Sequence, residues 1–165
     1  MEIRKAALND GQAFWQLLKR LDQETEFMLY EPDERVEDPE KIDTILKQSI
    51  NGENLLLVAE DDGALVGYLS AQREHLSRIH HVAYVVIGIR ADYQHQGIGS
   101  RLFDLLDEWA RECGIRRLEL TVMCENINAQ KLYIKKGFQR EDIKQDAICK
   151  DGRYYNEYYM GKLLI

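Results

Sequence analysis

The hydrophobic pattern of the chain changes its period at Gly97, and this change limits the folds that are open to it. From His81 to Ile89 the sequence is rich in β-branched residues, which is typical of a strand. After Gly97, apolar side chains recur at spacings of three and four up to Cys113, and Gly114 supplies a helix stop. A strand, a polar turn and a glycine-marked helix therefore follow one another. This order is typical of layered folds that combine helices with one sheet.

The segments on either side extend this pattern. Before it, the sequence predicts a strand at 2–6, a helix at 10–23 with Asn9 or Asp10 as its cap, a helix from Asp38-Pro39 to Gly52, and a hairpin of strands at 55–59 and 64–72. After it, the sequence predicts a strand at 118–122, a helix at 126–136, and strands at 138–144 and 154–163. We expect a single α/β (α+β) domain over residues 1–165, with a mixed, mostly antiparallel sheet of about six to seven strands and about four helices.

Composition narrows the class of protein further. Of the 165 residues, 45% are apolar and 31% are charged, which excludes a disordered chain and disfavours a membrane protein. A formal net charge of −7 opposes binding to nucleic acid or to an anionic membrane. The N-terminus lacks the apolar core of a signal peptide, and no apolar run approaches the roughly 18 to 20 residues of a bilayer span. We therefore expect a cytoplasmic protein without nucleic-acid or membrane partners.

The three cysteines, Cys113, Cys124 and Cys149, predict neither a disulfide framework nor a metal site. Their number is odd, they form no CxxC pair, and no histidine stands at metal-ligand spacing from them.

The first motif with chemical content lies between the strand and the glycine-marked helix, where residues 89–100 read IRADYQHQGIGS. Glycines at a helix N-terminus let backbone N–H groups approach an anion, and the helix dipole favours negative charge there. A Walker loop is excluded because no Gly-Lys-Ser/Thr is present, and a dinucleotide fingerprint would need a third glycine where Leu102 stands. The alternative is a helix that merely begins at a glycine.

The second motif runs from Asn126 to Phe138. Asn126 is a predicted N-cap and Gly137 a predicted C-terminal stop, and Ala129, Leu132 and Tyr133 share one helix face. The spacing alone favours Tyr133 as a core aromatic residue with a satisfied hydroxyl group.

Together the two motifs resemble those of the GNAT superfamily of N-acetyltransferases. The family pattern Gln/Arg-x-x-Gly-x-Gly/Ala is met by Gln94-x-x-Gly97-x-Gly99. The later pattern is met by Asn126, Ala129, Leu132-Tyr133 and Gly137-Phe138. The resemblance is close from Val82 to Phe138 and looser elsewhere.

This resemblance implies that acetyl-coenzyme A is the acyl donor, and the cysteine spacing above already favours a protein without a metal. The residues implied at the cofactor phosphates are Gln94, His95, Gln96, Gly97, Ile98, Gly99 and Ser100. The residues implied along the pantetheine are Ile87, Gly88, Ile89, Asn126 and Asn128, and Lys131 is a further implied cofactor-binding residue. In such enzymes the strand ending at Ile89 splays from the next one, and its free N–H groups stabilise the oxyanion when a neutral amine attacks the thioester. Tyr133 would protonate the departing thiolate.

The general base departs from the common family pattern. Many relatives carry a glutamate on the strand before the glycine turn, but here Ala83 and Val85 occupy the candidate positions. His81 is predicted on the same strand face as Ala83, which makes it the best local substitute, acting through a water molecule. The alternatives are a solvent-exposed histidine at a strand end, and His80 or Tyr84 on the opposite face.

The acceptor is expected to be a primary amine of a small molecule or peptide. An acidic loop at about 24–40 would favour a cationic amine, although a solvated connection is the simpler interpretation. Tyr154, Tyr155, Tyr158 and Tyr159 could line the acceptor site or a homodimer surface. A non-catalytic acyl-coenzyme A sensor is the alternative to an enzyme, since the usual carboxylate is missing; the retained Tyr133 favours the enzyme.

Overall fold

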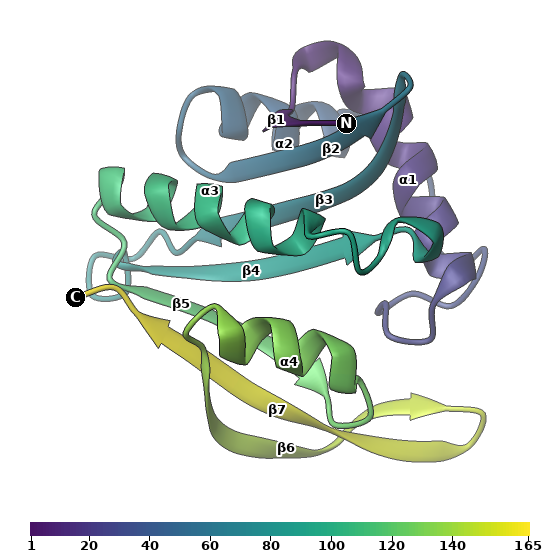
Figure 1. Ribbon diagram of the computed structural model, residues 1–165, viewed down its shortest axis with the longest axis vertical. Coiled ribbons are helices and arrows are strands. Elements are labelled where there is room, and N and C mark those ends of the chain that lie inside the picture. Colours follow the sequence, from purple (N-terminus) through teal and green to yellow (C-terminus); the bar gives the residue numbers. More distant parts are fainter. The chain divides into compact units, whose positions relative to one another are not determined.

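The computed structural model describes residues 1–165 and contains seven strands, four α-helices and two short 3-10 helices (Figure 1). The strands are β1 (Glu2–Lys5), β2 (Leu55–Asp61), β3 (Ala64–Arg73), β4 (Val82–Ile89), β5 (Arg117–Met123), β6 (Gln139–Lys150) and β7 (Arg153–Leu163). The helices are α1 (Gly11–Glu24), α2 (Pro39–Ile50), α3 (Ile98–Glu112) and α4 (Ile127–Lys135), with η1 (Leu8–Asp10) and η2 (Ala91–Tyr93). The sheet has the strand order β1-β2-β3-β4-β5-β7-β6 and is mixed, since β4 and β5 are parallel.

These elements confirm the predicted fold class, and most predicted boundaries lie within a few residues of the observed ones. One boundary matters for function. β4 begins at Val82, so His81 lies in the preceding turn rather than in the strand, where the sequence placed it. No helix has the length and apolar character that a membrane-spanning segment needs.

The helix caps follow the sequence with one exception. Asp38 accepts a hydrogen bond from Lys41 N at 3.1 Å, and Pro39 occupies the first position of α2, where no N–H is needed. Asp10 stands at the N-cap position of α1, but its carboxylate accepts from Arg4 and from Ala7 N instead of from the helix. An arginine within reach competes well with a cap, because hydrogen bonds between ionised groups are the stronger ones.

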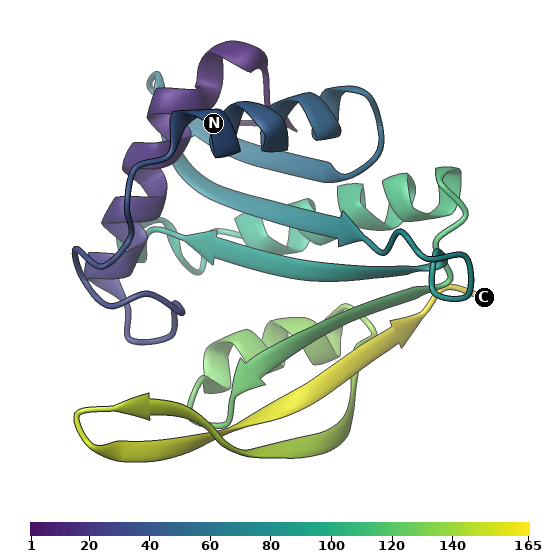
Figure 2. The same ribbon diagram turned by 180° about the vertical axis from the view of Figure 1, so that it is seen from behind.

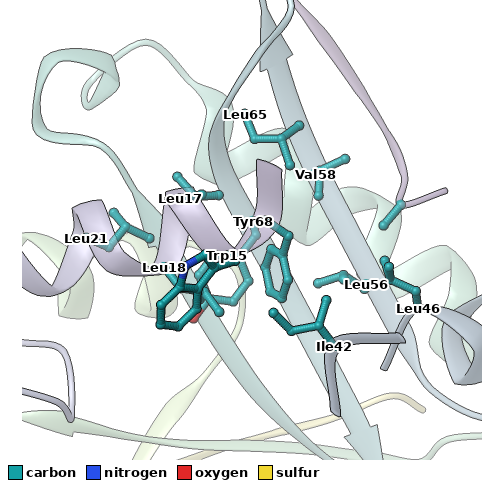
Figure 3. Close-up of a cluster of buried hydrophobic side chains, with 12 residues drawn as sticks. Trp15, Leu17, Leu18, Leu21, Ile42, Leu46, Leu56, Val58, Leu65 and Tyr68 are labelled. Carbon is teal, nitrogen blue, oxygen red and sulfur yellow. The ribbon is translucent and has the colours of Figure 1, made fainter. Parts of the chain in front are cut away.

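The chain divides into two compact units, of which the first comprises Met1–Gln72 and Val86–Trp109. In this unit β1, β2 and β3 pair antiparallel, and α1 and α2 cover one face of β2 and β3 (Figure 2). Figure 3 shows the resulting core, in which Trp15 and Leu18 of α1 lie near Tyr68 of β3 and Ile42 of α2. α3 lies over the opposite face of these strands (Figures 1 and 2).

The second unit comprises Arg73–Val85 and Ala110–Ile165. Val82–Tyr84 of β4 pair in parallel with Arg117–Glu119 of β5, and β7 pairs antiparallel with both β5 and β6. α4 lies against one side of β5 and β7 (Figures 1 and 2). The long β6–β7 hairpin is irregular between Lys144 and Ile148, where its register shifts.

Candidate active site

The segment between β4 and α3 forms a tight turn held by its own side chains. Gln94 Nε2 donates to Ile89 O at 3.2 Å, and Gln96 Nε2 donates to Asp92 O at 3.2 Å. The first helical bond of α3 runs from Arg101 N to Gly97 O at 3.1 Å. The N–H groups of Ile98, Gly99 and Ser100 therefore belong to the first turn of the helix, where a helix offers no partner of its own.

Two residues of this turn have left-handed backbone conformations. His95 has a φ of 61° and Gly97 a φ of 80°. A non-glycine residue in this region costs about 1–2 kcal/mol, so the surrounding hydrogen bonds must hold His95 in place. Left-handed residues in a tight turn can point neighbouring N–H groups toward one side, and such concavities bind anions.

The charges around the turn suit an anion. The first turn of α3 contains no acidic residue, which a helix N-terminus usually favours, and it carries Arg101. An exposed Cβ at Gly97 would meet nothing within 4 Å, so the space beside this glycine is open. The residues present therefore fit a phosphate group bound through backbone amides.

The predicted pantetheine residues of β4 lie in the same unit. Gly88 is buried, and Ile87 and Ile89 are half-buried. A Cβ at Gly88 would stand 2.8 Å from Leu21 Cδ1 and 3.0 Å from Tyr68 Cε1, so a larger residue here would have to displace these side chains of α1 and β3. The resemblance assigns Gly88 to the cofactor site. Its packing against Leu21 and Tyr68 is a separate, structural explanation for a glycine at this position.

α4 carries the other predicted residues, in the second unit. Asn126 caps the helix by accepting from Ala129 N at 3.3 Å, as predicted, while Asn128 and Lys131 are exposed. Tyr133 is buried to 7% exposure, and its ring centroid lies 6.1 Å from that of Phe138. The ring of Tyr133 therefore lies in the core, as the spacing predicts. The role of its hydroxyl group as a proton donor stays a prediction.

His81 is exposed and lies in the turn before β4. Its carbonyl oxygen accepts from Arg116 N at 2.9 Å and from Arg117 N at 3.0 Å, which ties this turn to the start of β5. His80 is likewise exposed, and its carbonyl accepts from Arg73 Nε at 2.8 Å. Tyr84 donates to or accepts from Thr121 Oγ1 at 2.8 Å.

A family model described as the acetyltransferase (GNAT) family matches residues 15–138. The chain belongs to this GNAT family. The L-amino acid N-acetyltransferase AaaT of Escherichia coli (strain K12) is 33% identical to it over 111 residues, which are 65% of this chain and 67% of that protein. Another curated relative is matched over only 36% of its own length.

Solved structures of acetyltransferases share the fold over almost the whole chain. An acetyltransferase of the GNAT family from Streptococcus pneumoniae has a TM-score of 0.93 at 31% identity, covering 99% of both chains. A ribosomal-protein-alanine N-acetyltransferase from Brucella melitensis has a TM-score of 0.86 at 24% identity, covering 99% of this chain and all of that one. This GNAT protein is thus an acetyltransferase, and acetyl-coenzyme A is its acetyl donor.

Several carboxylates of the acidic region at 24–40 in this GNAT acetyltransferase make structural contacts. Glu24 belongs to α1 and is paired with arginine, Asp38 caps α2, and Glu34 Oε2 accepts from Glu31 N at 2.8 Å. Arg35, which the sequence did not single out, is held by Asp22 through bonds of 2.7 and 3.0 Å. Its guanidinium also lies 4.1 Å above the Tyr30 ring. The loop is therefore anchored to α1 by a partly buried ion pair.

Gln130 is a further residue of this region, and no sequence motif distinguishes it from an exposed helical glutamine. Its side chain is 1% exposed. Nε2 donates to Met123 O at 3.1 Å and to Cys124 O at 2.9 Å, and Oε1 accepts from Arg140 Nη2 at 2.8 Å. The Gln130 amide, three residues before Tyr133, therefore holds α4 against the end of β5.

The three cysteines are free thiols. No three His, Cys, Asp or Glu side chains gather in an arrangement that could hold a metal ion.

Proposed function

We propose that this chain acts as a single cytoplasmic domain that transfers the acetyl group of acetyl-coenzyme A to a primary amine by direct attack. The observation that carries the proposal is the turn at 94–100, with its left-handed residues and its open helix N-terminus. Backbone N–H groups of such a turn suit the pyrophosphate of a coenzyme A thioester. We assign Ile87, Gly88, Ile89, Asn126 and Asn128 to the pantetheine, and Lys131 to the cofactor without choosing the part that it contacts.

In this mechanism the neutral amine attacks the carbonyl carbon of the thioester. The C–N bond forms as the carbonyl oxygen gains negative charge, and backbone N–H groups of β4 stabilise that charge. The C–S bond then breaks, the sulfur leaves as a thiolate, and Tyr133 protonates it. The amine loses one proton in forming the amide, so the proton count balances without a covalent enzyme intermediate.

The amine must lose a proton before it attacks. An ordinary alkyl ammonium has a pKa of about 10.4, so little of it is neutral at pH 7. We assign this proton either to His81, acting through a water molecule, or to the solvent. The exposed position of His81 in the turn before β4 is compatible with both routes.

The names of relatives suggest two kinds of acceptor. One relative acts on L-amino acids and another on the alanine of a ribosomal protein. Both carry a primary amine, which is the chemistry we propose here. Glu31, Asp33 and Glu34 in the α1–α2 loop would favour a cationic amine by long-range attraction.

The experiment that tests the proposal measures thiol release from acetyl-coenzyme A with three groups of amines. These are free L-amino acids, peptides with N-terminal alanine, and diamines. Release that depends on one group, with the acetylated amine identified by mass, supports the proposal. Binding of acetyl-coenzyme A without acetyl transfer to any group would favour the acyl-coenzyme A sensor. Sedimentation of the same protein tests whether the β7 tyrosines support a homodimer.

A further inference from the structure

Glu24, the last residue of α1, is a partly buried carboxylate that the mechanism above does not use. Its side chain is 17% exposed. Oε2 accepts from the backbone N–H of Ala91 at 2.9 Å, and Oε1 accepts from Arg20 Nε at 2.5 Å. Arg90 Nε lies 3.8 Å from the same Oε1 and makes no hydrogen bond of its own. All these residues belong to the first compact unit.

Ala91 begins η2, three residues before Gln94, so Glu24 holds the backbone where it enters the phosphate turn. The neighbouring Arg90 N donates to Val66 O at 2.9 Å. Within the segment, Tyr93 N donates to Arg90 O at 2.9 Å. The turn is thus fixed to β3 by one backbone bond and to α1 by the Glu24 carboxylate.

A carboxylate at this place is electrostatically unfavourable for the proposed ligand. Coenzyme A carries several phosphate charges, and the chain already has a net charge of −7. Burial by itself would raise the pKa of Glu24, but the Ala91 N–H and then Arg20 outweigh it, and the pKa lies below its ordinary value. The side chain is therefore ionised at neutral pH. The negative charge of Glu24 does not help to bind the phosphates, so its role lies in the contacts that its carboxylate makes within the protein.

We propose that Glu24 is a positioning residue, which orders the phosphate turn by holding the N–H of Ala91 and the Arg20 and Arg90 side chains. The inference rests on the proposed function, because it takes the turn at 94–100 as the phosphate site. It also links the end of α1, where the acceptor loop begins, to the segment that binds the donor. Positioning and charge predict opposite signs for the same substitution, which makes the role testable.

The first measurement is the affinity for coenzyme A, by calorimetry, of wild type, Glu24→Ala and Glu24→Gln. Glu24→Ala removes every contact, and we expect affinity to fall about tenfold or more, because hydrogen bonds to charged groups are the stronger class. Glu24→Gln keeps an oxygen for Ala91 N–H but turns an NH2 group toward the arginines, so an intermediate loss is expected. Glu108→Gln removes one exposed carboxylate from α3 and should leave affinity unchanged. Affinity that rises or stays constant in both Glu24 variants would overturn the positioning role.

The second measurement separates positioning from a general loss of structure. Acetyl-pantetheine lacks the nucleotide phosphates and therefore does not use the turn. We expect kcat/KM of Glu24→Ala to fall about tenfold with acetyl-coenzyme A, through KM, and to stay within about twofold of wild type with acetyl-pantetheine. An equal loss with both donors would make Glu24 a structural or catalytic residue and overturn the inference. Wild type that binds no coenzyme A would contradict the proposed function itself, and this role with it.

Discussion

Arg4 and Asp10 form a two-point ion pair, with Arg4 Nη1 at 2.7 Å from Asp10 Oδ2 and Nη2 at 3.0 Å from Oδ1. Arg4 lies in β1 and Asp10 closes η1, so the pair joins the first strand to the start of α1. Asp10 is 7% exposed and also accepts from Ala7 N at 2.7 Å. The hydrogen bonds from Arg4 outweigh the opposing effect of burial, and the pKa of Asp10 lies below its ordinary value.

This pair predicts a loss of stability in acid. A carboxyl group whose pKa is lower in the folded state stabilises the fold above its unfolded pKa, and this contribution disappears as the pH falls through the folded value. We therefore expect the free energy of unfolding to fall as the pH drops below about 4, the ordinary pKa of aspartate. Asp10→Asn should lower stability at pH 7 and weaken the acid dependence, measured by urea unfolding at several pH values. Asp62→Asn, in the exposed β2–β3 turn, is the control that should keep the wild-type dependence.

Tyr133→Phe separates the two roles of this side chain. The ring packs near Phe138 in either case, so the variant should fold and bind coenzyme A as the wild type does. If the hydroxyl group protonates the thiolate, kcat should fall about 100-fold or more, which is the usual range for acid catalysis. Steady-state kinetics with acetyl-coenzyme A measure this. Unchanged turnover would leave Tyr133 as a core aromatic residue only.

Gly97→Ala tests whether the backbone of the turn binds the donor. No atom would obstruct the new Cβ, so its cost comes from the φ of 80° and amounts to about 1–2 kcal/mol. The strained turn should relax, move its N–H groups, and reduce the thermal shift caused by coenzyme A. Gly152→Ala is a matched control, since Gly152 has a φ of 73°, equally open surroundings, and a place in the β6–β7 turn. If both variants lose the same stability and neither loses the thermal shift, the phosphates do not bind at this turn.

The fold was largely predictable because its signals are local. The change of period at Gly97, the Asp38-Pro39 helix start and the glycines after α3 and α4 each act within one turn of the chain, and all appear where expected. The sequence predicts that this strand begins at His81, one residue before the observed start of β4. A pattern of side chains does not show where the hydrogen bonds between strands begin. The turn hydrogen-bonds through its carbonyl to Arg116 and Arg117, which are distant in sequence.

The polar residues that fix the candidate site were not predictable for the same reason. The sequence places Glu24 at the start of the acidic loop at about 24–40, and only the fold brings Ala91 to its carboxylate. Gln130 has no sequence signal, because its partners are backbone carbonyls and a side chain ten positions away. Asp22 and Arg35 are thirteen positions apart, across a loop without periodicity. Contacts of this kind depend on tertiary structure rather than on local pattern.

His81→Ala decides between the two routes for the amine proton. With a saturating amine the rate should rise between about pH 6 and pH 9, as more of the amine becomes neutral. If His81 removes the amine proton through a water molecule, its loss should shift or flatten that rise. His80→Ala removes a neighbouring exposed imidazole and should leave the profile unchanged. A His81→Ala profile identical to that of wild type would assign the proton to the solvent.

The carboxylates of the α1–α2 loop make the last prediction, which concerns the charge of the acceptor. Glu31→Gln, Asp33→Asn and Glu34→Gln together remove three negative charges with little change of shape. Asparagine tolerates the left-handed conformation of Asp33, whose φ is 64°, and glutamine can keep the bond to Glu31 N. If the loop attracts a cationic amine, the triple variant should raise KM for that amine more than for a neutral one. The difference should shrink at 1 M salt, where the Debye length is about 3 Å. Equal KM changes for both amines would show that the loop only connects α1 to α2. The acceptor would then be selected by other residues.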